Sequence, residues 1–453
     1  MKILVCVKVI NGEINPFDES ALECALQLGD DVTVISMGAE STKGALLAIT
    51  RLGAKVILLS DVAFAGSDTL ATSKVLATAI RPMDYDLILC GRQSVDGDTA
   101  QVGPMVSSML GCSLITNGLK VSVENDSVIA DTRNGKETVK LPALVTVERG
   151  YVLRFPSIFS KVGEVKIIDN SIVGCDVEEC GLSGSPTRVL NTFENERGKR
   201  KCRFIDKSEL TELIKSFSGF DDSKKTDALN KDKLKSVWAV GEEVIEKARE
   251  IAHEVICVDK TDGQAVANRA LIEKPEAILW NADLWGRKNA PIAAAILNTG
   301  LCADCTELDV EDGKLIMYRP ARGGSVYAKI KCLTLPQMAT VRTKSKSSDI
   351  IVSAGKGVAH IIDKVKDFAD NIGAELGASR GLVDMGKLPY DCQVGLTGKT
   401  VSPRVYIAVG ISGAVHHTCA IESADIVIAI NPDKDARIFE YADYGIIDNF
   451  ENI

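Results

Sequence analysis

The sequence is poor in aromatic residues and histidines, and it has no long apolar run. Aromatic residues make up only 5% of the 453 residues, fewer than the strands of an all-β sandwich usually carry. No stretch reaches the roughly 18 uninterrupted apolar residues that a membrane-spanning helix requires, so we expect no membrane span. The four histidines include no pair near the one close cysteine pair, so we expect no metal site.

Composition and charge then limit the class of protein. The 62 acidic residues outnumber the 53 basic ones and give a net charge of −9, which argues against nucleic acid as the main partner. The 37 glycines far exceed the 13 prolines, as in α/β proteins with many tight turns between strands and helices. The length corresponds to roughly three domains at about 150 residues each.

The N-terminus and the cysteines indicate a cytoplasmic protein. The first ten residues are apolar but are interrupted by Lys8 and lack a small-residue cleavage site, so they predict a strand and not a signal peptide. Thirteen scattered cysteines without a secretion signal are expected to be reduced thiols. We expect Cys302 and Cys305 to be buried structural residues, in preference to a redox or metal pair.

Residues 1–170 alternate strand and helix signals. Strands are predicted at 2–10, 32–37, 55–59 and 86–90, and helices at 18–28, 42–52 and 68–80. This order predicts a parallel sheet covered by helices on both faces.

The sequence also contains an internal repeat. Residues 85–92 resemble 275–282, and residues 141–148 resemble 335–342, in the same order. Residues 123–126 and 310–313, which precede the second match in each half, are both predicted hairpin turns. We therefore expect an α/β fold with two related parallel-sheet domains, at 1–185 and 236–344, joined by a polar arm and linker at 186–235.

Residues 345–453 are predicted to form a third, open-sheet domain. Its strands at 349–354, 406–409 and 426–430 each stop at a glycine, serine or asparagine, and ligands of such sheets lie beyond the carboxyl ends of the strands. Three glycine-rich loops, at 377–381, 393–398 and 410–417, could bring backbone N–H groups and hydroxyls to a phosphate. No Walker motif is present.

In this order, the three loops resemble the α subunit of electron-transfer flavoproteins. The resemblance also includes residues 300–306, 429–431 and 442–445. The first 190 or so residues look like the β subunit of the same family, on the basis of residues 15–18, 91–104 and 182–187. Because the family is usually a heterodimer of related subunits, the chain looks like a fusion of a β and then an α subunit, which accounts for the repeat.

The resemblance implies FAD in the C-terminal domain. Arg380 would favour the anionic reduced flavin, Arg342 would approach the ring from the neighbouring domain, and His417 would lie near its carbonyl edge. The remaining implied contacts are Ser379 and Thr397 to the ring or ribityl chain, Ser412, Gly413 and Ala414 to the pyrophosphate, Asn431 and Asp443 to the adenosine, and also Gln393, Val394, Gly395 and His416.

The chain departs from the family pattern at two of these loop positions. The family commonly has glutamine where this chain has Leu396 and His416. The first change removes a polar group near the flavin, and the second adds a titratable one, so both could shift the flavin potential.

The resemblance also implies a second nucleotide in the N-terminal domain, either a second FAD or AMP. The implied contacts are Cys6, Val7, Asn15, Met37, Gly38, Asp96, Gly97, Thr99, Ala100, Gln101 and Val102. The small residues Gly97 and Ala100 favour the larger FAD. The segment from Lys8 to Asn15 is shorter than usual in the family and leaves AMP open.

The resulting hypothesis is an electron carrier without a catalytic nucleophile. It would pass electrons from a donor to a partner flavoenzyme of the acyl-CoA dehydrogenase type, with Leu182 on the docking surface. NADH, and ferredoxin or flavodoxin, would be further partners if the second nucleotide were an FAD that splits electron pairs. The alternatives are a carrier with one FAD and a structural AMP, an adenine-nucleotide-binding protein without redox chemistry, and an NAD-dependent oxidoreductase with its own substrate.

Overall fold

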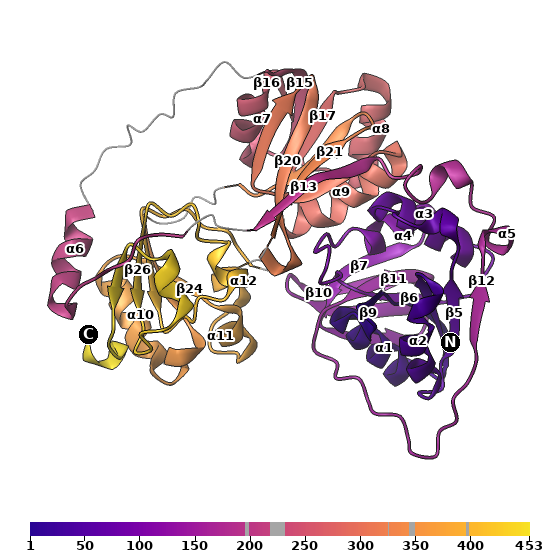
Figure 1. Ribbon diagram of the computed structural model, residues 1–453, viewed down its shortest axis with the longest axis horizontal. Helices are drawn as coiled ribbons and strands as arrows, with labels where there is room; N and C mark the ends of the chain where they lie inside the picture. The colour runs from indigo at the N-terminus through magenta and orange to yellow at the C-terminus, as the bar shows by residue number, and fades with distance from the viewer. Residues whose placement is uncertain (195–198, 218–231, 325, 344–348, 396–397) are drawn as a thin grey trace. The chain divides into compact units, whose positions relative to one another are not determined.

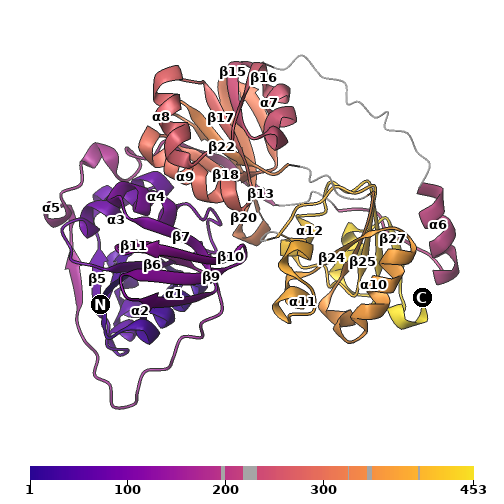
Figure 2. The same ribbon diagram turned by 180° about the vertical axis from the view of Figure 1, so that it is seen from behind.

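The computed structural model describes residues 1–194, 199–217, 232–324, 326–343, 349–395 and 398–453 (Figures 1 and 2). The chain divides into two compact units. The N-terminal unit contains residues 1–192, 232–322 and 328–341, and the C-terminal unit contains residues 193–231, 323–327 and 342–453.

Seven parallel strands form the first sheet of the N-terminal unit, in the order β12-β5-β4-β1-β6-β11-β7. They are β1 (Lys2–Cys6), β4 (Asp31–Met37), β5 (Lys55–Leu59), β6 (Leu87–Gly91), β7 (Ser113–Gly118), β11 (Ala143–Val147) and β12 (Val165–Ile168). Helices α1 (Pro16–Leu28) and α2 (Lys43–Thr50) cover one face, and α3 (Thr69–Ile80) and α4 (Val102–Leu110) cover the other (Figure 1). Burial on both faces explains why the strands read as nearly continuous apolar runs.

The strand predicted at residues 2–10 is shorter in the structure. It ends at Cys6, and the chain then forms a separate small hairpin of β2 (Val9–Ile10) and β3 (Glu13–Ile14). The hairpin turns at Asn11 and Gly12, whose φ angles of 52° and 84° are typical of a two-residue turn. The apolar residues alone therefore predicted one continuous strand where the chain ends one strand and turns into a hairpin.

A second parallel sheet of the N-terminal unit repeats five adjacent strands of the first, in the order β16-β15-β17-β22-β18. Its strands are β15 (Leu234–Val240), β16 (Ala252–Val258), β17 (Ala277–Asn281), β18 (Leu301–Cys305) and β22 (Gln337–Val341). Helices α7 (Ile245–Ile251), α8 (Gly263–Glu273) and α9 (Leu284–Leu297) accompany it. The pairs β6–β11 and β17–β22 contain the repeated segments, so the predicted repeat is confirmed.

Two smaller sheets lie mainly in the N-terminal unit. One contains β8 (Lys120–Glu124), β9 (Ser127–Thr132) and β10 (Gly135–Lys140), and the other has the order β13-β21-β20-β19. The latter strands are β13 (Thr187–Glu194), β19 (Glu307–Glu311), β20 (Lys314–Ala321) and β21 (Val326–Cys332). The predicted turns are the hairpins β8–β9 and β19–β20.

The C-terminal unit is built on six parallel strands in the order β14-β27-β26-β25-β23-β24. They are β14 (Arg203–Phe204), β23 (Ile350–Ala354), β24 (Glu375–Ala378), β25 (Val405–Val409), β26 (Ile426–Ile430) and β27 (Tyr444–Ile446). Helices α6 (Leu210–Phe217) and α10 (Ile362–Asn371) pack on its core. The segment predicted as an extended arm instead supplies β13, β14 and α6. The two strands pair with strands from other parts of the chain, and α6 packs on the core of the C-terminal sheet.

Within the described ranges, no helix is both long enough and apolar enough to cross a membrane.

Candidate nucleotide-binding sites

The loops of the C-terminal unit meet at the carboxyl edge of its sheet. Ala354 pairs with Ala378 on one side and with Val409 on the other, and Val409 pairs with Ile430. The residues that follow these strand ends therefore lie along one edge, and they include Ser379, Gly410 and Asn431. This edge is where open parallel sheets bind their ligands.

Glycines give the loop after β25 one compact shape. Gly413 has a φ of 86°, and a Cβ atom there would lie 2.1 Å from the backbone nitrogen of Ile438. The Asn431 side chain donates to the Ile411 carbonyl at 2.9 Å and accepts from the Asp433 N–H at 3.0 Å. Any larger residue at position 413 would have to displace the backbone of residues 437–438.

The same loop offers backbone donors. Across the ranges that the structure describes, the N–H groups of Ser412, Gly413 and Ala414 have no hydrogen-bond acceptor. They precede α12 (Val415–Thr418), and successive unpaired N–H groups of this kind can bind an anion. A phosphate or pyrophosphate therefore fits this loop.

The middle loop lies against the end of β24. The Val394 N–H donates to the Ala378 carbonyl at 2.8 Å, and the Lys399 N–H donates to the Gln393 carbonyl at 2.8 Å. Gln393, Val394 and Gly395 are thereby brought beside Ser379. Leu396 and Thr397 lie outside the described residues.

The two neighbouring histidines have different environments. His417 is buried, and its Nε2 lies 2.7 Å from the hydroxyl oxygen of Tyr406. Burial lowers the pKa of His417 to about 4, although the backbone of Val394 acts in the opposite direction. His417 is therefore neutral at neutral pH, whereas His416, on the same short helix, is exposed.

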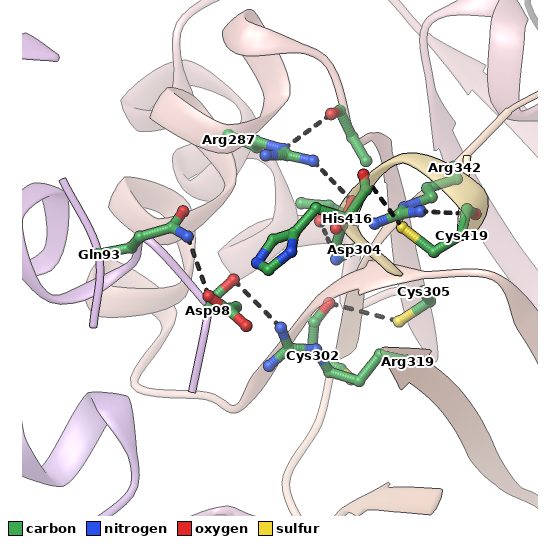
Figure 3. A network of polar contacts seen from close by, with 12 residues as sticks. Gln93, Asp98, Arg287, Cys302, Asp304, Cys305, Arg319, Arg342, His416 and Cys419 are labelled. Atoms are coloured by element: carbon green, nitrogen blue, oxygen red, sulfur yellow. Dashed lines mark hydrogen bonds and ion pairs between the residues drawn. The ribbon is translucent and has the colours of Figure 1, made fainter. Parts of the chain in front are cut away.

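Two arginines provide positive charge in this unit. Arg342 is buried, and its Nη1 donates to the Cys419 carbonyl at 3.4 Å (Figure 3). Arg380 is half-buried at the start of α11 (Arg380–Asp384), and its Nε donates to the Asp384 carboxylate at 3.2 Å. Both guanidinium groups stay charged at any physiological pH.

Asp443 is placed apart from these loops. It precedes β27, and its carboxylate accepts hydrogen bonds from Arg200 and from the Val427 N–H, the latter at 2.8 Å. These contacts lie at the amino ends of β26 and β27, on the opposite edge of the sheet from Asn431. The structure does not bring Asp443 together with the other residues expected to bind FAD.

A cavity of about 970 Å³ opens at the carboxyl edge of the first sheet in the N-terminal unit. Its volume is near the upper end of the range for small-molecule sites. Ten of the eleven residues expected around a second nucleotide line it, namely Cys6, Val7, Asn15, Met37, Gly38, Gly97, Thr99, Ala100, Gln101 and Val102. The eleventh, Asp96, forms an ion pair of 2.6 Å with Lys8, which does line the cavity.

Several lining residues were missed from the sequence. The wall continues through residues 60–62, 64–69 and 72, which follow β5 and begin α3, and it includes Asp18 beneath the first loop. The strand signal at 55–59 could have identified the first group, because ligands gather beyond the carboxyl end of every strand of such a sheet.

Two buried or half-buried carboxylates shape the charge of this cavity. Burial raises the pKa of Asp18 to about 7, against hydrogen bonds from the N–H groups of Lys8 at 2.8 Å and Gly91 at 3.0 Å. Burial also opposes ionisation of Asp96, but hydrogen bonds from Lys8 and Ser94 outweigh it and lower the pKa of that carboxyl. Asp96 is therefore ionised and held by Lys8.

The structure also gives the positions of the two cysteines and the leucine singled out from the sequence. Cys302 and Cys305 are free, buried thiols, as predicted, and the Cys305 thiol donates to the Cys302 carbonyl at 3.6 Å. Among the described residues, no group of three or more histidine, cysteine or acidic side chains could hold a metal ion. Leu182 is 60% exposed, although its side chain packs over Gly66 in the cavity wall.

Parallel sheets with glycine-rich loops and a large cavity at their carboxyl edges define an α/β protein of the nucleotide-binding class. Comparison with known families then specifies which one. Residues 3–169 and 246–363 match the electron transfer flavoprotein domain, and residues 345–422 match the electron transfer flavoprotein FAD-binding domain. The chain belongs to the electron transfer flavoprotein family.

Individual relatives match the two parts of the chain separately. The electron transfer flavoprotein subunit alpha of Thermoanaerobacterium thermosaccharolyticum is 41% identical over 236 residues, which cover 41% of this chain and 72% of that subunit. Subunit beta of the same organism is 43% identical over 195 residues, covering 40% of this chain and 75% of the subunit. The protein FixB of Rhizobium meliloti is 35% identical over 232 residues, covering 41% of this chain and 66% of FixB.

Proposed function

We propose that this chain is an electron carrier in which a β-subunit-like part, residues 1–185, is fused to an α-subunit-like part, residues 236–453. The observation that carries the proposal is the glycine-rich edge of the C-terminal sheet, within the match to an FAD-binding domain. The separate matches to an alpha and a beta subunit support the fusion. Thirteen free cysteines support a cytoplasmic location.

When FAD is bound, its isoalloxazine ring supplies the electron transfer, and the protein contributes binding and electrostatics. Ser412, Gly413 and Ala414 would hold the pyrophosphate through their N–H groups. Ser379 and the backbone of residues 393–395 would position the flavin end, and Asn431 would fix the loop that faces the adenosine end.

Positive charge in this site would come from the arginines and not from His417. Because the imidazole is neutral at neutral pH, it can offer a hydrogen bond but no charge. Arg342 and Arg380 remain cations and would favour the negatively charged reduced flavin.

We propose a second nucleotide in the N-terminal cavity, with FAD favoured over AMP. Support comes from the extent of the wall, which continues from the loops expected to hold an adenine nucleotide to the end of β5 and the start of α3. AMP alone would leave part of such a wall without contacts. A second FAD would make NADH the electron donor, with ferredoxin or flavodoxin as a further acceptor.

The proposed electron acceptor or donor is a flavoenzyme of the acyl-CoA dehydrogenase type that docks at Leu182. An exposed leucine beside the cavity wall supports this surface. We predict that Leu182→Arg slows electron transfer to such a dehydrogenase at least tenfold and leaves the FAD content of the C-terminal unit unchanged. Equal transfer rates for Leu182→Arg and wild type, measured by stopped-flow absorbance, would contradict this docking surface.

The decisive measurement is the amount of FAD and AMP released from the purified chain by denaturation. We expect at least one FAD per chain. A second FAD and no AMP would support the electron-splitting form, and one FAD with one AMP would support the simpler carrier. A chain that contains AMP without flavin would overturn the electron-carrier proposal in favour of a nucleotide-binding protein.

A further inference from the structure

We propose that Arg319, in the second half of the N-terminal unit, is a positioning residue for the nucleotide loop of the first half. This loop, residues 96–101, is one wall of the N-terminal cavity. The inference rests on the second nucleotide of the proposed function, and it concerns which part of the chain sets the shape of that site.

The loop needs support from outside its own sequence. Asp98 and Ala100 have φ angles of 52° and 55°, although neither is a glycine. A residue with a Cβ atom enters this left-handed region only when surrounding contacts hold it there. The loop also contains Gly97, but the positive φ angles fall on Asp98 and Ala100 and not on this glycine.

Arg319 supplies two such contacts. It lies in β20, is only 4% exposed, and donates from Nη1 to the Gly97 carbonyl at 2.8 Å. Its Nη2 donates to the Asp98 carbonyl at 3.1 Å, and Figure 3 shows Arg319 beside Asp98. A planar guanidinium presents paired donors in a fixed geometry, which suits two consecutive carbonyls. A carbonyl oxygen held by Arg319 cannot turn into the cavity, where it would repel a phosphate.

Neighbouring contacts hold the rest of the loop. Gln93 donates to the Asp98 carboxylate at 3.0 Å. Gln101, only 1% exposed, donates to the Leu301 carbonyl at 3.0 Å and accepts from the Thr69 hydroxyl at 2.6 Å. Two separate strands of the second half, β18 and β20, therefore hold a loop that lines a cavity of the first half.

A second arginine of the same half serves as a matched control. Arg287 donates to the Asp304 carboxylate at 2.7 Å and to the Ala282 carbonyl at 2.9 Å. Like Arg319, it donates to a backbone carbonyl, but it is half-buried, and its acceptors, Ala282 and Asp304, lie outside residues 96–101. Removing it tests the loss of an arginine from this half without touching residues 96–101.

The experiment uses the full chain with FAD retained and with the N-terminal nucleotide removed by dialysis. AMP is titrated by isothermal calorimetry, because it is the part common to both candidate nucleotides. We expect Arg319→Met to weaken AMP binding at least tenfold, Arg319→Lys to give an intermediate loss, and Arg287→Met to bind like wild type. The thermal midpoints without AMP identify any general loss of folding.

The outcomes separate this inference from the proposed function. Wild-type affinity in Arg319→Met overturns the positioning role and leaves the second nucleotide intact. The same loss in Arg287→Met also overturns it, because the effect would then be a general one. If the wild-type chain binds neither AMP nor a second FAD, the proposal of a second nucleotide site is wrong. Should Arg319→Met not fold, Arg319→Lys, which keeps the length and charge of the side chain, decides between the same outcomes.

Discussion

At the scale of single residues, the pair of Tyr406 and His417 decides how charge is arranged beneath the flavin loops. The sequence placed His417 in a binding loop through its resemblance to a family, and it offered no sign of the tyrosine partner in β25, the strand that precedes this loop. The hydrogen bond of 2.7 Å depends on a tertiary contact between β25 and α12. The same limit applies to Asp443, whose partner Arg200 lies far away in the sequence.

Burial of His417 predicts a particular dependence of stability on pH. Its pKa falls from an unfolded value near 6.5 to about 4 in the folded protein, so the unfolded chain binds more protons between these values. The stability that the neutral form contributes is present above about pH 6.5 and is lost as the pH falls toward 4. With 1.36 kcal/mol per pKa unit, the loss reaches about 3 kcal/mol.

We therefore expect the free energy of unfolding of the C-terminal unit to rise with pH from 4 to 6.5 more steeply in wild type than in His417→Asn. Chemical denaturation at intervals of pH measures both slopes, and subtracting them removes the contribution of other groups. His416→Asn is the control, since that side chain is exposed. Parallel curves for wild type and His417→Asn would contradict a buried neutral imidazole.

At the scale of elements, local signals located most strands and helices because burial on both faces leaves a clear apolar pattern. The strand at 55–59 and the helix at 68–80 agree with β5 and α3 to within a residue. The pattern failed where a turn interrupts apolar residues, as at Asn11, and where a polar segment such as β13 gains stability only from strands elsewhere in the chain. Residues 60–72 were missed as a cavity wall because they carry no motif.

The loop after β25 gives a prediction that belongs to this scale. Gly413→Ala would place a Cβ atom 2.1 Å from the Ile438 nitrogen, in a backbone conformation with φ of 86°. The loop must then move, and its N–H groups lose their alignment toward a pyrophosphate. We expect at least a tenfold weaker affinity for FAD, measured by flavin fluorescence during titration of the apoprotein.

Gly373→Ala provides the matched control for that change. Gly373 also has a positive φ, of 65°, but a Cβ atom there would have no neighbour within 4 Å. We expect a cost of about 1 kcal/mol in stability from backbone strain and an unchanged FAD affinity. Equal FAD affinity in both variants would show that the loop at Gly413 does not determine FAD binding.

At the scale of the whole molecule, the arrangement of hydrophobic cores determines how many parts unfold independently. The two related sheets share a cluster in which Leu70 and Met105, from the first half, pack with Trp238 and Ala290, from the second. Among the residues that the structure describes, the clusters around Val352 and Tyr406 draw only on the C-terminal unit. The sequence indicated three domains by length and repeat, but it could not reveal which of them share a core.

We therefore expect scanning calorimetry of the full chain to give two transitions and not three. FAD should raise the transition temperature of the C-terminal unit, and AMP should raise the transition temperature of the part that contains both related sheets. When the free ligand is at 100 times its dissociation constant, each adds about 2.7 kcal/mol to the free energy of unfolding. Each ligand stabilises only the unit whose folded form binds it. Three separate transitions, or a single one raised equally by both ligands, would contradict this division, and Gly413→Ala should reduce the FAD shift and leave the AMP shift unchanged.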